Sequence, residues 1–237
     1  MKKLLYFLTS LVILLTSCSK DPQPDPIKNF SVLGDSFSAY EGYVDPETND
    51  TWTYYENIGV TEVEQMWWHQ VMVETGWTLE RNNSFSGSLI CNMNHDNYYG
   101  PHSYLRRMDD LGHPDAIFVF GGTNDIVDKA PLGDYVYADW TEEQLCMFRP
   151  GLACLLDGLK QLYPQAILYL MIDMDLGTGG AEESDREAFI ESMHLIANHY
   201  QVKCIDLYSI HKDWWHPDVK GQADIARQVL EAVRGQV

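Results

Sequence analysis

Residues 115–121 read Asp-Ala-Ile-Phe-Val-Phe-Gly and place five apolar residues in a row between an acid and a glycine. A run this short and this apolar predicts a strand that is buried on both faces. Strands of that kind occur where helices cover both sides of a parallel sheet. This stretch therefore favours an α/β fold.

On either side of this run, short apolar segments alternate with segments of helical periodicity. Further strands are predicted over residues 30–34, 78–86, 166–171 and 204–208, of which 78–86 is the most polar and suits a sheet edge. Helices are predicted over residues 67–76, 141–159, 189–200 and 225–233. This alternation predicts a three-layer sandwich: a mainly parallel sheet of about five strands with helices on both faces.

The helix predicted over residues 141–159 carries two local signals. Thr141-Glu142-Glu143-Gln144 resembles a capping box, which marks where a helix begins. Pro150 lies within the apolar stripe and should kink or divide the helix, because proline lacks the N–H that a helix interior needs.

The first 17 residues resemble a targeting signal. Two lysines precede an apolar run over residues 4–15, which is too short for a permanent membrane span and predicts a signal peptide. The run ends in Leu15-Thr16-Ser17-Cys18, which resembles a bacterial lipobox and implies that Cys18 is lipidated. Ser19 after the cysteine favours the outer membrane, on either its periplasmic or its cell-surface face. The alternative is an ordinary signal peptide with an incidental cysteine.

Residues 18–29 are rich in proline and polar residues, which predicts an extended tether, and residues 30–237 form one domain. The formal net charge of −19 disfavours nucleic acid as a partner and favours a neutral or weakly charged substrate. Four cysteines in a domain of this size are not a disulfide framework, so buried free thiols are expected. These are Cys91, Cys146, Cys154 and Cys204.

Two polar motifs fall where the first strand ends and where the last helix begins. Gly34-Asp35-Ser36 follows the first strand, so the Ser36 hydroxyl should lie at the carboxyl edge of the sheet, where α/β proteins form their sites. Asp213-Trp214-Trp215-His216-Pro217 precedes the last helix. A serine nucleophile needs a base, and the base needs a carboxylate that holds its tautomer. His216 and Asp213 can meet both needs. By itself, Gly-Asp-Ser could equally be an ordinary turn.

Two further motifs close neighbouring strands. Gly122-Thr123-Asn124-Asp125 follows the most apolar strand, and Asn124 can offer a side-chain N–H to an oxyanion. Gly87 follows the polar edge strand and would let a backbone N–H approach a substrate closely.

These four blocks, in this order, resemble those of the SGNH/GDSL hydrolases. The resemblance implies that Ser36 is the nucleophile, His216 its base and Asp213 the orienting acid. It also implies an oxyanion hole formed by the Ser36 N–H, the Gly87 N–H and Asn124 Nδ2. Gly76 and Gly100 are alternatives to Gly87. No metal or organic cofactor is implied, and the spacing of His95, Asp96 and His102 fits no standard metal site.

Three long segments, residues 40–65, 92–107 and 126–140, follow predicted strand ends and should rim the same face. They combine aromatic with polar residues, which favours sugar stacking. Trp67 and Trp68 are expected in the core, whereas Trp52, Tyr55 and Trp214 are candidate substrate contacts. The expected activity is removal of O-acetyl or other short acyl groups from carbohydrates. Alternatives are a lysophospholipase, a general short-chain esterase, or a non-catalytic glycan-binding surface lipoprotein.

Overall fold

Five parallel strands form the central sheet of the protein, in the order β2-β1-β3-β4-β5. The computed structural model describes residues 26–44, 58–93, 102–177 and 181–235. The strands are β1 (Asn29–Gly34), β2 (Thr78–Ser84), β3 (Ala116–Phe120), β4 (Ile167–Asp173) and β5 (Lys203–Leu207). All neighbouring pairs are parallel, so the predicted sheet is confirmed. The apolar run that suggested it is β3, buried at every residue, and the polar strand β2 lies at an edge.

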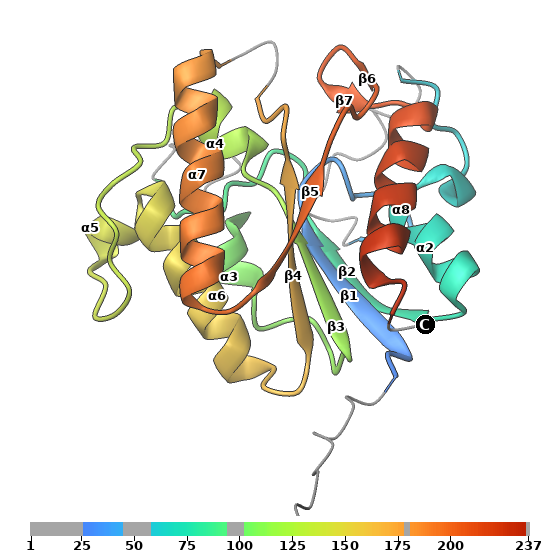
Figure 1. Ribbon diagram of the computed structural model, residues 1–237, viewed down its shortest axis with the longest axis horizontal. Helices are drawn as coiled ribbons and strands as arrows, with labels where there is room; N and C mark the ends of the chain where they lie inside the picture. The colour runs from blue at the N-terminus through green and yellow to red at the C-terminus, as the bar shows by residue number, and fades with distance from the viewer. Residues whose placement is uncertain (1–25, 45–57, 94–101, 178–180, 236–237) are drawn as a thin grey trace, which may run out of the picture.

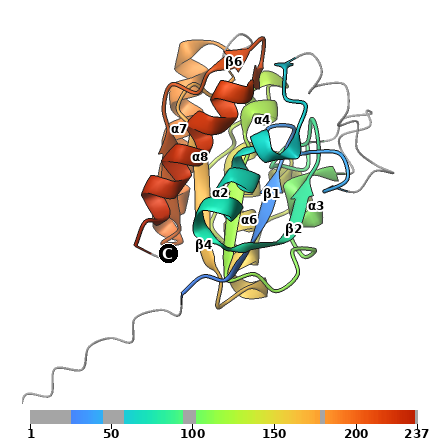
Figure 2. The same cartoon turned by 90° about the vertical axis from the view of Figure 1, so that its right-hand side faces the viewer.

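Helices cover both faces of this sheet, as Figures 1 and 2 show. One layer consists of α2 (Trp67–Thr75) and α8 (Val219–Val233), preceded by the short 3-10 helix η1 (Val63–Gln65). The other layer contains α3 (Tyr104–Arg107), α4 (Thr123–Val127), α5 (Glu142–Leu145), α6 (Phe148–Leu162) and α7 (Glu183–His199). A separate apolar core fills the space between the sheet and each layer, and Trp67 and Trp68 are fully buried in the first.

The helix predicted over residues 141–159 is divided, but the break comes before the proline. The Thr141 capping box is present and opens α5, the chain leaves helical geometry at Cys146 and Met147, and α6 then begins at Phe148. Pro150 is the third residue of α6, in the first turn, where no intrahelical N–H is required. The proline therefore starts a second helix rather than kinking a single one.

A two-stranded antiparallel hairpin follows β5 and was not predicted. Its strands are β6 (Lys212–Asp213) and β7 (His216–Pro217), and Asp213 pairs directly with His216. Trp214 in the connecting turn has a left-handed backbone, with φ of 57°. Such a conformation is uncommon outside glycine, so residue type gave no signal for this turn.

The sequence predicted that residues 126–140 would rim the carboxyl edge of the sheet, but the segment begins there, at the end of α4, and then leaves this edge. Tyr137 stacks on His199 with ring centroids 3.8 Å apart, and its carbonyl accepts a hydrogen bond from Tyr200. Both partners lie at the end of α7, which leads into the start of β5. The aromatic residues of this segment pack as a local core on the α6–α7 layer, because that layer offers apolar surface to bury.

The four cysteines Cys91, Cys146, Cys154 and Cys204 are free thiols, as expected, but only Cys91 is buried and the other three are partly exposed. Within the ranges that the structure describes, no helix is long and apolar enough to cross a membrane.

Candidate active site

The turn that carries Ser36 follows β1 at the carboxyl edge of the sheet. Gly34 ends the strand at a point where a side chain would meet Ser84 Oγ at 2.6 Å, so glycine is needed for this approach. Ser38 N and Ala39 N both donate to the carbonyl of Asp35, which closes a tight turn around Ser36. Ser36 is only 7% exposed, so the residue is buried rather than on an open surface.

His216 lies beside this serine. Its Nε2 is 3.0 Å from Ser36 Oγ, although 180 residues separate the two in the sequence. The imidazole is buried, with 9% of the residue exposed, and the Phe37 ring packs edge-on against it at 5.6 Å. Burial, followed by the positive charge of Lys212, lowers the pKa of His216 to about 4. A neutral imidazole can accept the serine proton, so this pair has the geometry of a nucleophile and its base.

Gly87 and Asn124, the other predicted oxyanion residues, follow the strands β2 and β3. Gly87 has a φ of 76°, a conformation that favours glycine, in the turn that follows β2. Asn124 Nδ2 is 3.0 Å from the carbonyl of Ser88 and 3.3 Å from Asp35 Oδ2. The amide therefore lies between the turn that carries Ser36 and the turn that carries Gly87. The alternative Gly76 ends α2, before β2 begins, and is at the opposite end of that strand.

Arg107, which was not singled out from the sequence, ties these turns together. Its guanidinium donates to the carbonyl of Gly34 at 3.2 Å and to Ser88 Oγ at 3.0 Å. It also donates to Asn83 through both the carbonyl and Oδ1, and to the carbonyl of His102. Burial lowers the pKa of Arg107 to about 10, so the group stays charged at neutral pH. This arginine joins the ends of β1 and β2 to the Gly87 turn.

Two carboxyl groups are buried under the site. Asp35 Oδ1 accepts the N–H of Phe37 at 3.0 Å, and burial raises the pKa of Asp35 to about 7. Asp125 accepts the N–H groups of Ile90 and Cys91, and burial raises its pKa to about 6. Both acids therefore organise backbone near the reactive pair rather than contacting it.

Asp213 and Trp214 occupy the hairpin that carries His216. Asp213 is opposite His216 in the hairpin, which brings the two backbones together, but its side chain is exposed. Among the described residues, no hydrogen bond or ion pair joins the Asp213 carboxylate to the His216 ring. Trp214 is 77% exposed, and its ring centroid lies 6.2 Å from that of His216. The structure thus places an exposed indole beside the His216 imidazole.

Several predicted residues lie outside the described ranges. These are the lipidation residue Cys18, the candidate substrate contacts Trp52 and Tyr55, the alternative Gly100, and His95 and Asp96. In the part of the chain that the structure describes, no cluster of three or more acidic, histidine or cysteine side chains is arranged to hold a metal ion.

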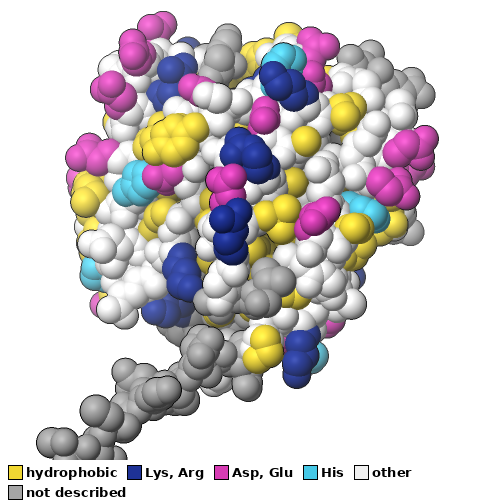
Figure 3. Space-filling view, turned by 45° about the vertical axis from the view of Figure 1, so that its right-hand side comes forward, with side chains coloured by type: hydrophobic (Ala, Val, Ile, Leu, Met, Phe, Trp, Pro, Cys, Tyr) yellow, Lys and Arg dark blue, Asp and Glu magenta, His cyan; other side chains and the backbone are white. Residues whose placement is uncertain are grey.

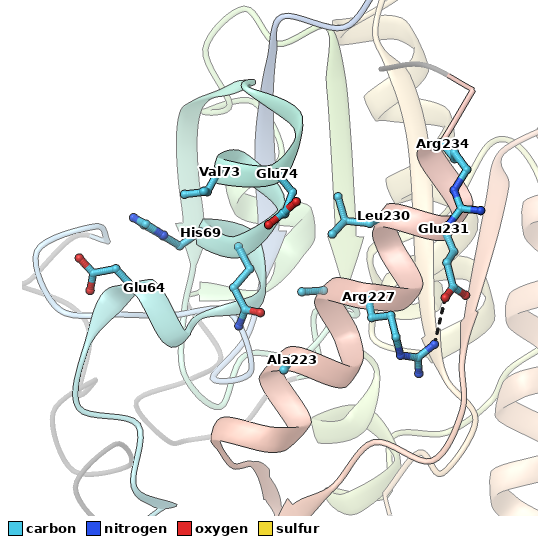
Figure 4. A pocket seen from close by; sticks show the side chains of 11 residues that line it. Glu64, His69, Val73, Glu74, Ala223, Arg227, Leu230, Glu231 and Arg234 are labelled. Atoms are coloured by element: carbon cyan, nitrogen blue, oxygen red, sulfur yellow. Dashed lines mark hydrogen bonds and ion pairs between the residues drawn. The ribbon is translucent and has the colours of Figure 1, made fainter.

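A depression of about 530 Å³ lies between α2 and α8 and is not the candidate site. Figure 4 shows His69, Val73 and Glu74 on one helix, and Ala223, Arg227 and Leu230 on the other. No serine lines this depression, and its acids and arginines are intermixed, as they are over the face shown in Figure 3. It therefore lacks the convergent polar groups found around Ser36.

Comparison with known proteins identifies the family of this chain. A family model described as GDSL-like lipase/acylhydrolase matches residues 28–233. A protein from Bacteroides ovatus described as a GDSL-like lipase is 41% identical, with a TM-score of 0.79, over 89% of this chain and 100% of that one. Its counterpart from Bacteroides uniformis is also 41% identical, with a TM-score of 0.78, over 88% and 96%.

Solved structures with lower sequence identity are similar to this chain in fold alone. A family two carbohydrate esterase from Clostridium thermocellum is 14% identical, with a TM-score of 0.59, over 90% of this chain and 65% of that one. Comparison with functionally curated proteins gives no match.

Proposed function

Because the chain belongs to the GDSL-like lipase/acylhydrolase family, we propose that it is a serine esterase in which Ser36 is the nucleophile and His216 its general base. The observation that carries the proposal is the 3.0 Å contact between Ser36 Oγ and His216 Nε2, two residues that are both buried. A serine hydroxyl attacks poorly unless a neutral base can take its proton, and this geometry supplies one.

The proposed reaction passes through an acyl-enzyme. Ser36 Oγ attacks the ester carbonyl carbon, and its proton moves to His216 Nε2. The bond to the alcohol then breaks, and His216 returns the proton to the leaving oxygen. Water attacks the acyl-Ser36 ester in the same way, releasing the acid and restoring the serine. The N–H groups of Ser36 and Gly87 and the Asn124 amide are the proposed oxyanion donors, and losing one typically costs about 10²–10³ in rate.

Turnover of p-nitrophenyl acetate tests the proposal. Ser36→Ala should abolish turnover while the far-UV circular dichroism spectrum stays unchanged. Activity near that of the unmodified protein in this variant would disprove the assignment of the nucleophile.

The proposed substrate is a carbohydrate that carries O-acetyl or other short acyl groups. The exposed Trp214 indole beside His216 supports this, since flat aromatic surfaces pack on the apolar faces of sugar rings. Trp52 and Tyr55 are proposed as further contacts from their sequence context. A short-chain esterase of broad specificity or a lysophospholipase would share the reactive pair and differ in how it uses Trp214.

Substitution of Trp214 distinguishes these substrates. Trp214→Ala should lower kcat/KM on an acetylated oligosaccharide by about tenfold, the effect of one stacking contact, and should change p-nitrophenyl acetate turnover little. The matched control is Tyr208→Ala, which removes an exposed ring near the end of β5. Equal losses on both substrates would contradict the carbohydrate assignment, and a loss confined to a lysophospholipid would favour the lipid alternative.

Export with a lipid anchor on Cys18 is proposed from the motif at residues 15–18. In the native host, metabolic labelling with a fatty acid should mark the protein, and Cys18→Ser should remove the label. Labelling that persists in the variant would contradict the anchor.

A further inference from the structure

The hairpin that carries His216 is attached to the sheet by a buried ion pair. Lys212 Nζ lies 2.5 Å from Asp173 Oδ2, and the two side chains are 11% and 1% exposed. The same ammonium donates to the carbonyl of Asp175 at 3.3 Å. Lys212 belongs to β6, whereas Asp173 is the last residue of β4. This ion pair thus joins the two-residue strand β6 to the carboxyl end of β4 in the central sheet.

Asp173 itself is held firmly. Its Oδ1 accepts the N–H of Asp175, and its carbonyl accepts the N–H of Leu176. In the sheet it is in register with Leu207, the last residue of β5. The turn after β4 and the pairing of β4 with β5 hold Asp173 in place, so its carboxylate is a fixed partner for Lys212.

Lys212 also contacts the surroundings of the reactive pair. Its ammonium lies 5.8 Å from the centroid of the Phe37 ring, and that ring packs edge-on against the His216 imidazole. Lys212 pairs with Pro217 across the hairpin, next to His216. The lysine therefore supports the imidazole along the backbone and through Phe37, without contacting Ser36 itself.

We propose that Asp173 and Lys212 are positioning residues of the esterase site, whose ion pair fixes the β6–β7 hairpin to the end of β4 and holds the His216 imidazole against Ser36. This inference rests on the proposed function. A hairpin of two-residue strands has little stability of its own, so its position has to be set by such contacts.

The pair has an electrostatic consequence that a purely structural contact would lack. The Lys212 cation disfavours protonation of His216 and adds to the effect of burial on its pKa. Among the described residues, the other charged groups on the elements next to the reactive pair are Asp213 on β6, Asp35 beside Ser36, and Asp218 at the start of α8. Asp218 is already paired with His211 at 2.7 Å. Removing Lys212 would leave Asp173 without its cation, and both changes favour the imidazolium.

The test measures kcat and KM for p-nitrophenyl acetate across pH in three variants. Lys212→Met should lower kcat at pH 7 by about tenfold or more with little change in KM, because a displaced imidazole slows proton transfer. Its acid limb in kcat/KM should move to higher pH. Lys212→Arg keeps the cation and should recover most of the rate. Lys220→Met, an exposed lysine at the start of α8, is the control and should behave like the unmodified protein.

A double variant separates positioning from stability. Lys212→Met with Asp173→Leu removes both charges, so no unpaired buried carboxylate remains and the fold should be retained. The proposal predicts that the double variant keeps a low kcat, like that of Lys212→Met. Its melting temperature should be closer to that of the unmodified protein than the melting temperature of Lys212→Met is. Recovery of kcat together with the melting temperature would overturn it. So would a Lys212→Met enzyme with an unchanged kcat and acid limb, provided that Ser36→Ala is inactive on the same ester. Activity in Ser36→Ala would instead refute the proposed function itself.

Discussion

At the scale of single residues, the proposed mechanism makes the reactivity of Ser36 depend on the protonation state of His216. The imidazole is buried beside Lys212, and these two causes lower its pKa to about 4 from an ordinary value of about 6.5. Above the lowered value the ring is neutral and can act as a base. We therefore expect the acid limb of kcat/KM for p-nitrophenyl acetate to lie near pH 4, since this ratio reports the free enzyme. An acid limb near pH 6.5 would contradict the buried, cation-flanked imidazole.

Asp213 is the proposed orienting acid for the His216 imidazole. It faces His216 across the hairpin, where cross-strand side chains lie within about 5.5 Å at their Cβ atoms, but its carboxylate is exposed. If the carboxylate orients the ring during turnover, Asp213→Asn should lower kcat, although by less than His216→Ala does. An unchanged kcat would mean that the attachment of the hairpin, rather than Asp213, fixes the imidazole.

At the scale of elements, the site depends on how strand ends are joined, and Arg107 joins two of them. Replacing it with methionine removes the hydrogen bonds that the guanidinium donates to the carbonyls of Gly34 and Asn83, at about 1–3 kcal/mol for each group left unsatisfied. The Gly34 carbonyl keeps the N–H of Phe85. Arg107→Met should therefore lower the melting temperature and reduce kcat. The neighbouring Arg106 is exposed, and Arg106→Met is the matched control. Equal behaviour of the two variants in thermal melts and kinetics would contradict this role.

Most strands and several site residues could be predicted from the sequence pattern of the individual elements. The strands were predictable because burial on both faces demands an unbroken apolar run, as in β3. Ser36, Gly87 and Asn124 were predictable candidates because each follows a strand of one parallel sheet, whose carboxyl ends share an edge. Local pattern alone does not give a contact such as that between Asp173 and Lys212, which lie 39 residues apart. Nor does it show which surface an aromatic segment covers, as Tyr137 on α7 demonstrates.

At the scale of the whole molecule, the buried carboxyl group of Asp35 makes the stability of the fold depend on pH. The chain has a net charge of −19, and Asp35 lies fully buried under the reactive pair. Burial raises the pKa of Asp35 to about 7 from a usual value of 3.8, so the folded state binds this proton more tightly than the unfolded state. The resulting stability is fully present below pH 3.8 and is lost as pH rises through 7.

Asp35→Asn removes this titration while keeping an acceptor for the Phe37 N–H. Relative to the unmodified protein, the variant should therefore gain stability between pH 4 and pH 8, by on the order of a few kcal/mol. Urea unfolding at the two pH values measures the change, and Asp109→Asn, an exposed acid, is the control. The prediction fails if Asp35→Asn and its control respond to pH alike.

The central claim is that Ser36 is a nucleophile activated by His216, and covalent trapping tests it most directly. A fluorophosphonate transfers its phosphonyl group to an activated serine and loses fluoride, and the adduct can be located by intact mass and peptide mapping. We predict a single adduct on Ser36, absent in Ser36→Ala and formed far more slowly in His216→Ala. An adduct on a different residue, or esterase turnover that survives while Ser36 stays unmodified, would contradict the account.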